Sequence, residues 1–148
     1  MELHYLALTS AGIKLEHGPW EDDLKDVEGA YMNNRGEFIV AELDGKIVGM
    51  GAIRYKSEII AEVKRMRVDP GQQRSGIGSR ILAILEVKAK ELGYKELHLD
   101  TSSQLVGAMN FYLKHGYVEF KRVKRDNGEL VFFMKNIEDA VDYEYEIY

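Results

Sequence analysis

A strand, a glycine-rich turn and a helix follow one another between residues 60 and 92, and this segment restricts the fold more than any other. Residues 60–68 have the composition of a strand, and Asp69-Pro70-Gly71 ends it. After Gly76 the period becomes helical, with one apolar stripe formed by Ile77, Ile81, Leu85, Ala89 and Leu92 and ended by Gly93. Residues 95–101 form a further short strand. Because two parallel strands need such a crossover, the segment predicts one parallel strand pair.

The rest of the chain predicts antiparallel strands and two more helices. Residues 37–43 and 46–55 flank Asp44-Gly45, a strong signal for a hairpin, and residues 3–8 can form a short first strand. Helical spacing extends from about Pro19 to Tyr31 and again over 105–113, where Gly116 ends it. A last hairpin joins 117–123 to 129–135. The sequence therefore predicts an α+β fold with a mixed, mostly antiparallel sheet, as a single domain over 1–148 with an acidic tail from about residue 137.

Composition and charge exclude several classes of function. Hydrophobic residues make up 45% and charged residues 30% of the 148 residues, which suits one globular domain, and the formal net charge is −5. Without cysteine there is no disulfide, no thiolate zinc ligand and no cysteine nucleophile, and the histidines lack metal-ligand spacing, so no metal is predicted. We find neither a signal peptide nor a membrane span and expect a cytoplasmic protein with no nucleic-acid or membrane partner. The basic cluster is read as a solvated hairpin face and comprises Lys121, Arg122, Lys124 and Arg125.

The turn at Gly76 and Gly78 favours an anion, because the N–H groups of a helix start are unpaired and carry the positive end of the dipole. A P-loop is excluded, since no lysine follows Gly78. A dinucleotide-binding turn lacks its third glycine, where Ile81 stands, although Asp100 ends the next strand as a ribose-binding acid would. A plain connecting turn is the alternative without a ligand.

Residues 73–78, "QRSGIG", match the pattern Gln/Arg-x-x-Gly-x-Gly/Ala at each fixed position, and here the sequence resembles the GNAT superfamily of acetyl-CoA-dependent N-acetyltransferases. The resemblance covers about residues 20–135 and includes "AELDGKIVGMGAI", "EVKRMRVDP" and "AMNFYLKHGY". It implies a parallel strand pair splayed around the cofactor, with helices on both faces of the sheet. The asparagine that the family commonly carries before its late helix is missing from "TSSQLVG".

The resemblance also implies a set of site residues. Backbone groups around Met66, Arg67 and Val68 are expected to bind pantetheine and to polarise the thioester. The pyrophosphate is expected on the loop and helix start formed by Gln73, Arg74, Ser75, Gly76, Ile77, Gly78 and Ser79. Tyr112 matches the tyrosine that protonates the leaving thiolate, and Glu62 stands in the register of a catalytic base. Alternation along residues 60–68 puts Glu62 on the face of Met66, unless a bulge intervenes.

Several alternatives remain open from the residues alone. Tyr112 lies on the apolar stripe of its helix and can be a core aromatic, while Glu62 can be a solvated strand charge. His98 and His115 are alternative bases because imidazole titrates near neutral pH, and His115 can instead cap its helix. The predicted activity is direct transfer of acetyl from acetyl-CoA to a primary amine on a small molecule or peptide, without an acetyl-enzyme. A non-catalytic acyl-CoA-binding module and a dinucleotide- or S-adenosylmethionine-binding enzyme are the alternatives, and a homodimer is suggested by the family.

Overall fold

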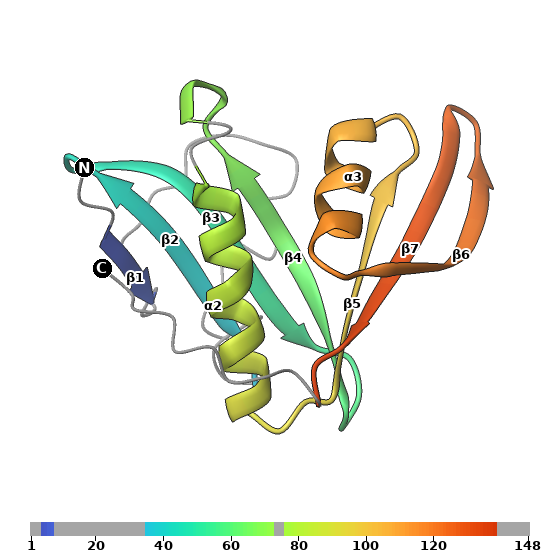
Figure 1. Cartoon of the computed structure of the whole chain (residues 1–148), viewed down its shortest axis with the longest axis horizontal. Helices are drawn as coiled ribbons and strands as arrows, with labels where there is room; N and C mark the ends of the chain where they lie inside the picture. The colour runs from blue at the N-terminus through green and yellow to red at the C-terminus, as the bar shows by residue number, and fades with distance from the viewer. Residues whose placement is uncertain (1–3, 8–34, 73–75, 139–148) are drawn as a thin grey trace.

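A seven-stranded mixed sheet forms the centre of the molecule (Figure 1). The computed structural model of the chain describes residues 4–7, 35–72 and 76–138. The strand order is β1-β2-β3-β4-β5-β7-β6, and among these strands only β4 and β5 pair in parallel. The strands are β1 (His4–Ala7), β2 (Glu37–Leu43), β3 (Lys46–Tyr55), β4 (Ile60–Val68), β5 (Glu96–Ser102), β6 (Val118–Arg125) and β7 (Gly128–Asn136).

The crossover and both hairpins are confirmed. Helix α2 (Ile77–Glu91) connects β4 to β5 and buries the predicted stripe from Ile77 to Ala89, whereas Leu92 caps the helix and is partly exposed. The β2–β3 hairpin turns at Asp44-Gly45, with both residues at positive φ, which is the reason for this residue pair. The β6–β7 hairpin turns at Asp126-Asn127, and its basic cluster is exposed as predicted, with Arg122 ion-paired to Glu119 and Glu129.

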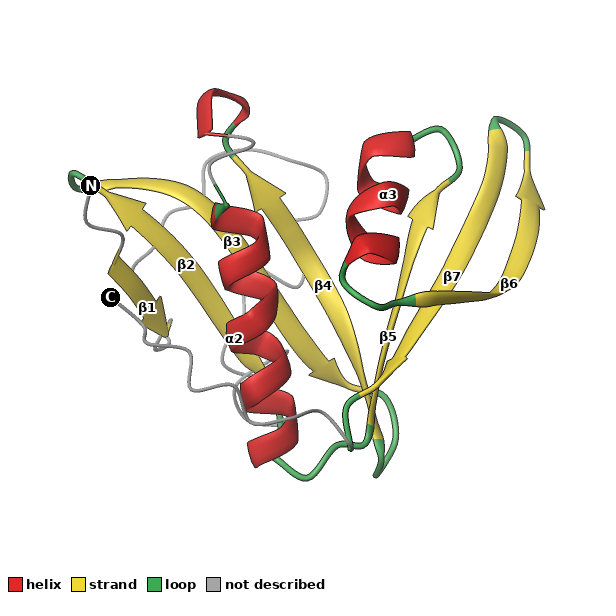
Figure 2. Cartoon of the chain, in the orientation of Figure 1, coloured by secondary structure: helices red, strands yellow, loops and turns green. Residues whose placement is uncertain are grey.

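Both α-helices of the described part, α2 and α3 (Val106–Lys114), pack on one face of the sheet (Figure 2). On β7, Lys135 forms an ion pair with Glu86 of α2, and Phe133, two residues away and therefore on the same face, packs against Tyr112 of α3. The helix predicted from about Pro19 to Tyr31 lies outside the described residues, so a helix on the second face stays a prediction. No helix in the described segments is long and apolar enough to cross a membrane.

Two glycines of β3 allow α2 to lie close to the sheet. A methyl group on Gly49 would lie 3.0 Å from side-chain atoms of Ile77 and Ile81. On Gly51 it would lie 2.6 Å from Sδ of Met66 and 2.7 Å from Cγ2 of Ile81. Real Cβ atoms essentially never come as close as the distances at Gly51, and those at Gly49 are tighter than most, so the helix–sheet distance here depends on glycine.

A β-bulge in β4 changes which face its residues occupy. Arg65 has φ 59°, and the pairing with β3 shifts between Lys64, which faces Ala52, and Arg67, which faces Met50. The extra residue interrupts the alternation, so Glu62 and Lys64 lie on the face away from α2, while Met66 lies on the face of α2, above Gly51 and beside Ile81. The simple alternation that puts Glu62 and Met66 on one face is therefore wrong, and the bulge is the reason.

The parallel strands separate directly before this bulge. Pairing of β4 with β5 comprises Ile60 with Glu96, Ala61 with Leu97, and Glu62 with His98. Beyond that point β5 continues to pair with β7 through Ser102, while β4 pairs with β3. Figure 1 shows the two strands diverging from this vertex, which confirms the predicted splayed pair.

Candidate active site

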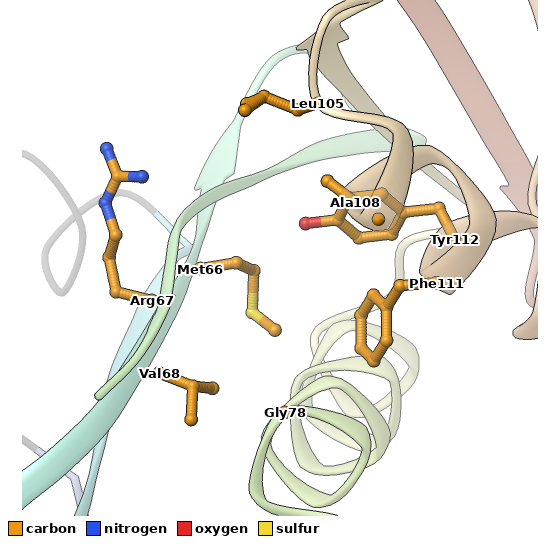
Figure 3. A pocket seen from close by; sticks show the side chains of 9 residues that line it. Met66, Arg67, Val68, Gly78, Leu105, Ala108, Phe111 and Tyr112 are labelled. Atoms are coloured by element: carbon orange, nitrogen blue, oxygen red, sulfur yellow. The ribbon is translucent and has the colours of Figure 1, made fainter. Parts of the chain in front are cut away.

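Strand β4 and the two helices border a cavity of about 650 Å³. It lies between the C-terminal half of β4, the first turn of α2 and the inner side of α3 (Figure 3). The lining residues are Met66, Arg67, Val68, Gly78, Leu105, Gly107, Ala108, Phe111 and Tyr112. Five of these were predicted as site residues from the sequence, and the four others come from the start and the inner side of α3.

Tyr112 presents its hydroxyl to this cavity. The ring is 8% exposed and packs edge-on against Phe111 and Tyr117, with centroid distances of 5.2 and 5.7 Å. In Figure 3 the oxygen points away from α3 toward β4. Burial raises the pKa of the hydroxyl to about 12, against a smaller lowering effect of Arg67. The ring of Tyr112 thus belongs to the core, as its place on the apolar stripe predicts, while its hydroxyl lies at the cavity.

The start of α2 is the helix end at which the sequence predicts an anion. Gly76 caps the helix with φ 86°, which glycine adopts freely, and as a glycine it offers the first turn no side-chain cap of its own. A methyl group on Gly78 would lie 3.5 Å from Val68 and 3.6 Å from the Phe111 ring, so this glycine borders the cavity without crowding. The side chain of Ile77 is buried in the core, which leaves only its backbone for a ligand. Gln73, Arg74 and Ser75 lie outside the described residues.

Ser79 connects the two helices that border the cavity. Its Oγ lies 2.9 Å from Nε2 of His115, the residue that caps the C-terminus of α3. The His115 ring also packs against Phe111 in a tilted arrangement, with 4.6 Å between the ring centroids. Burial lowers the pKa of His115, and Lys135 and Lys114 lower it further. His115 therefore has the capping position that its sequence suggests, and a hydrogen bond to α2 in addition.

Glu62 lies at the vertex of the splayed strands, on the face away from α2. Its side chain is 20% exposed, and its two oxygens face Arg54 Nη2 at 3.5 Å and Lys64 Nζ at 3.6 Å. Met66 and Glu62 therefore project from opposite faces of β4. Within the described residues no group of three or more His, Asp or Glu side chains has metal-binding geometry.

Part of the cavity lining is not predicted by the sequence. Leu105 and Leu113 belong to the apolar stripe of their helix, yet they are 54% and 50% exposed. Leu105 lies at the N-cap of α3 and borders the cavity, as does Phe111, which is off the stripe. An apolar period predicts one helix face but does not say whether that face meets the core or a ligand cavity.

The family model described as "Acetyltransferase (GNAT) family" matches residues 5–117. The chain belongs to this family. The GNAT domain is 33% identical over 102 residues to human N-acetyltransferase 8. This alignment covers 64% of this chain and 44% of that protein. It is 36% identical over 83 residues to the IAA acetyltransferase of Azospirillum brasilense, covering 55% of this chain and 54% of the relative.

The chain thus spans about half the length of these curated relatives. Among solved structures, a GNAT-family acetyltransferase from Staphylococcus aureus Mu50 superposes with a TM-score of 0.74 and 26% sequence identity. The alignment covers 83% of this chain and 82% of the other. The likeness therefore extends over most of both chains and is not confined to one local motif.

Proposed function

We propose that this GNAT domain transfers the acetyl group of acetyl-CoA directly to a primary amine on a small molecule or peptide. The observation that carries the proposal is the cavity between β4 and α3, which the first turn of α2 borders through Gly78 and into which Tyr112 projects its hydroxyl. Among proteins similar to this chain are those named N-acetyltransferase 8 and IAA acetyltransferase, and these names support the acetyl-transfer class.

The proposal implies one orientation of the cofactor in the cavity. Its pyrophosphate binds the N–H groups after Gly76, where the positive end of the α2 dipole adds roughly 0.3–1 kcal/mol. Its pantetheine arm extends along Met66, Arg67 and Val68, where the separation from β5 leaves β4 without a second sheet partner. The apolar stretch of the arm meets Ala108 and Phe111, and the thioester comes to lie between β4 and the Tyr112 hydroxyl.

The chain's residues supply each of the needs of amide formation. We expect a backbone N–H near the β4 bulge to polarise the thioester carbonyl as negative charge develops. Tyr112 keeps its hydrogen because its pKa is about 12, so it donates a hydrogen bond and then a proton to the sulfur as the C–S bond breaks. An acceptor ammonium must lose a proton before it attacks, and the vertex of the strands offers Glu62, the base implied by the resemblance, and its neighbour His98. The chain contains no cysteine, and direct attack on the thioester needs none.

The experiment compares two substitutions at one position. Gly78→Ala adds a methyl group at ordinary contact distance and should retain acetyl-CoA binding, whereas Gly78→Leu extends into the space between Val68 and Phe111 and should abolish it. Calorimetry with acetyl-CoA measures binding, and release of free thiol with a panel of amines measures turnover. Equal binding by both variants would refute the cavity as the cofactor site. Tight binding with no turnover on any amine would show a non-catalytic acyl-CoA-binding module.

A further inference from the structure

The vertex of the splayed strands presents a second ionisable side chain beside Glu62. Glu62 and His98 form the last pair of the parallel ladder, and directly paired residues project from the same face of a sheet. His98 is also largely buried, with its side chain 12% exposed. The half-exposed ring of Phe120 lies 5.1 Å from the imidazole, where a bulge between Glu119 and Lys121 takes Phe120 out of the pairing with β7. An imidazole thus lies at the point where the strands begin to separate.

Both ring nitrogens of His98 have polar neighbours, and these determine its tautomer. Nε2 lies 3.2 Å from Oε1 of Glu96, two residues earlier on the same face of β5. Nδ1 lies 3.4 Å from Nζ of Lys56, an exposed residue in the bend after β3. A carboxylate only accepts and an ammonium only donates, so Nε2 carries the hydrogen and Nδ1 holds the lone pair. The carboxylate orients the ring as it does in hydrolase triads, and the basic nitrogen already faces a primary ammonium.

We propose, on the basis of the function proposed above, that His98, oriented by Glu96, is the base that deprotonates the acceptor ammonium, and that Lys56 occupies the place of that ammonium until the acceptor binds. Lys56 is exposed and belongs to a bend, so its side chain can leave without disturbing a strand. Glu62 differs from His98 because each of its two oxygens faces a cation, Arg54 or Lys64. Both Glu62 oxygens thus face cations held on β3 and β4, whereas Nδ1 of His98 faces one ammonium, on an exposed side chain that the acceptor ammonium can replace.

The proton and electron balance is complete. The Nδ1 lone pair takes one proton from the acceptor ammonium, and the freed amine forms a C–N bond with the thioester carbonyl. The C–S bond breaks with its electron pair on sulfur, which receives the Tyr112 hydroxyl proton. The second nitrogen proton restores the tyrosine, and His98 releases its proton to solvent. Acetyl-CoA and an ammonium thus become an amide, coenzyme A thiol and one proton.

The charges around the imidazole give the assignment a test with opposite signs. Among the described residues, the charged or titratable groups on its face of the sheet include Lys56, Glu62, Lys64, Arg54, Arg67, Glu96, Asp100 and Lys121. Glu96→Gln removes the anion that stabilises the imidazolium, so the acid limb of the pH–rate profile should move to lower pH. Lys56→Met removes a cation that opposes it, so the same limb should move to higher pH. Neither substitution touches the proposed cofactor cavity.

The experiment combines single-turnover rates with spectroscopy of the free protein. Purified wild type, Lys56→Met, Glu96→Gln, His98→Gln and Glu62→Gln are loaded with acetyl-CoA and mixed with an accepted amine from pH 5.5 to 9. His98→Gln should lose about 10²-fold or more in rate and lose the acid limb, with acetyl-CoA affinity unchanged, and Glu62→Gln should keep the limb. Nitrogen-15 shifts of the substrate-free wild type should show the Nε2–H tautomer of His98, which tests the geometry without any variant.

Each result decides between outcomes. An acid limb that disappears in Glu62→Gln and persists in His98→Gln would assign the base to Glu62 and overturn the proposal. A limb that moves in the same direction, or not at all, in Lys56→Met and Glu96→Gln would overturn it too, as would an Nδ1–H tautomer. Wild-type protein that binds acetyl-CoA and acetylates no amine would instead refute the proposed function, and the assignment of a base would fall with it.

Discussion

Removal of the Tyr112 hydroxyl separates catalysis from packing in one substitution. Tyr112→Phe keeps the ring and its contacts with Phe111, Tyr117 and Phe133. In the described part of the chain the hydroxyl makes no hydrogen bond, so none of the usual ~1 kcal/mol of a net hydrogen bond is lost. We therefore expect the free energy of unfolding, measured by urea denaturation, to change by less than about 0.5 kcal/mol.

The rate should respond far more strongly. With a pKa of about 12, Tyr112 is a weaker acid than an ordinary thiol, whose pKa is about 8.5, so hydrogen bonding to the developing thiolate carries much of the stabilisation. Loss of one such preorganised donor costs roughly 10²–10³-fold in kcat, or about 2.7–4 kcal/mol. Single-turnover thiol release with saturating acetyl-CoA measures this step apart from product release.

A matched control is available in the adjacent buried tyrosine. The Tyr117 hydroxyl is also buried and has no hydrogen-bond partner in the described residues, but it does not line the cavity. Tyr117→Phe should therefore leave the single-turnover rate within about twofold of wild type, since it removes no group near the thioester. A full rate in Tyr112→Phe, or an equal loss in both variants, would refute a direct role of the Tyr112 hydroxyl.

Three further predictions concern Gly51, Gly76 and His115 at the C-terminus of α3. Gly51→Ala should destabilise the fold by about 1–3 kcal/mol and weaken acetyl-CoA binding, because the added methyl displaces Met66. The control Gly107→Ala, whose added methyl meets no atom within 4 Å, should not destabilise the fold. An unchanged free energy of unfolding and an unchanged acetyl-CoA affinity in Gly51→Ala, measured by denaturation and calorimetry, would disprove the close packing. In Gly76→Val the added side chain has free space around its Cβ, but the φ of 86° should cost about 1–2 kcal/mol of backbone strain and weaken coenzyme A binding. A coenzyme A affinity equal to that of the wild type would argue against the phosphate turn. Because the pKa of His115 is lowered from 6.5, the folded protein binds fewer protons at this residue than the unfolded chain, so the free energy of unfolding should fall as the pH decreases below about 6.5. His115→Gln should flatten this decrease, as measured by unfolding at a series of pH values. An unchanged slope would exclude His115 as the source of the decrease.

Local signals in the sequence were sufficient for most of the elements. The hairpin over 37–43 and 46–55 agrees with β2 and β3 at both ends, because Asp44 and Gly45 adopt the positive φ values that a two-residue turn requires. The helix that begins at Ile77 follows from its apolar period and from the glycine before it. These features depend on neighbours within a few residues, and that is the range over which periodicity and turn chemistry act.

The candidate site was only partly accessible from the sequence. The resemblance named Tyr112 and the residues from Met66 to Val68, and the structure brings these together around one cavity. It did not reveal that Arg65 forms a bulge, because a bulge is defined by pairing with β3 and not by the composition of β4. For that reason the sequence predicts Glu62 and Met66 on one face of β4, whereas the bulge puts them on opposite faces.

The sequence by itself determined the order of the elements, the single crossover and the glycine turn before α2, since each arises from contacts within a short stretch of chain. Only the tertiary structure decided which side chains meet at the vertex of the sheet. Lys56 and His98 are 42 residues apart in the chain, and Ser79 and His115 are 36 apart. Such pairs form because strand register and helix packing place distant backbone segments within hydrogen-bonding distance, and no local pattern of residue types encodes that register.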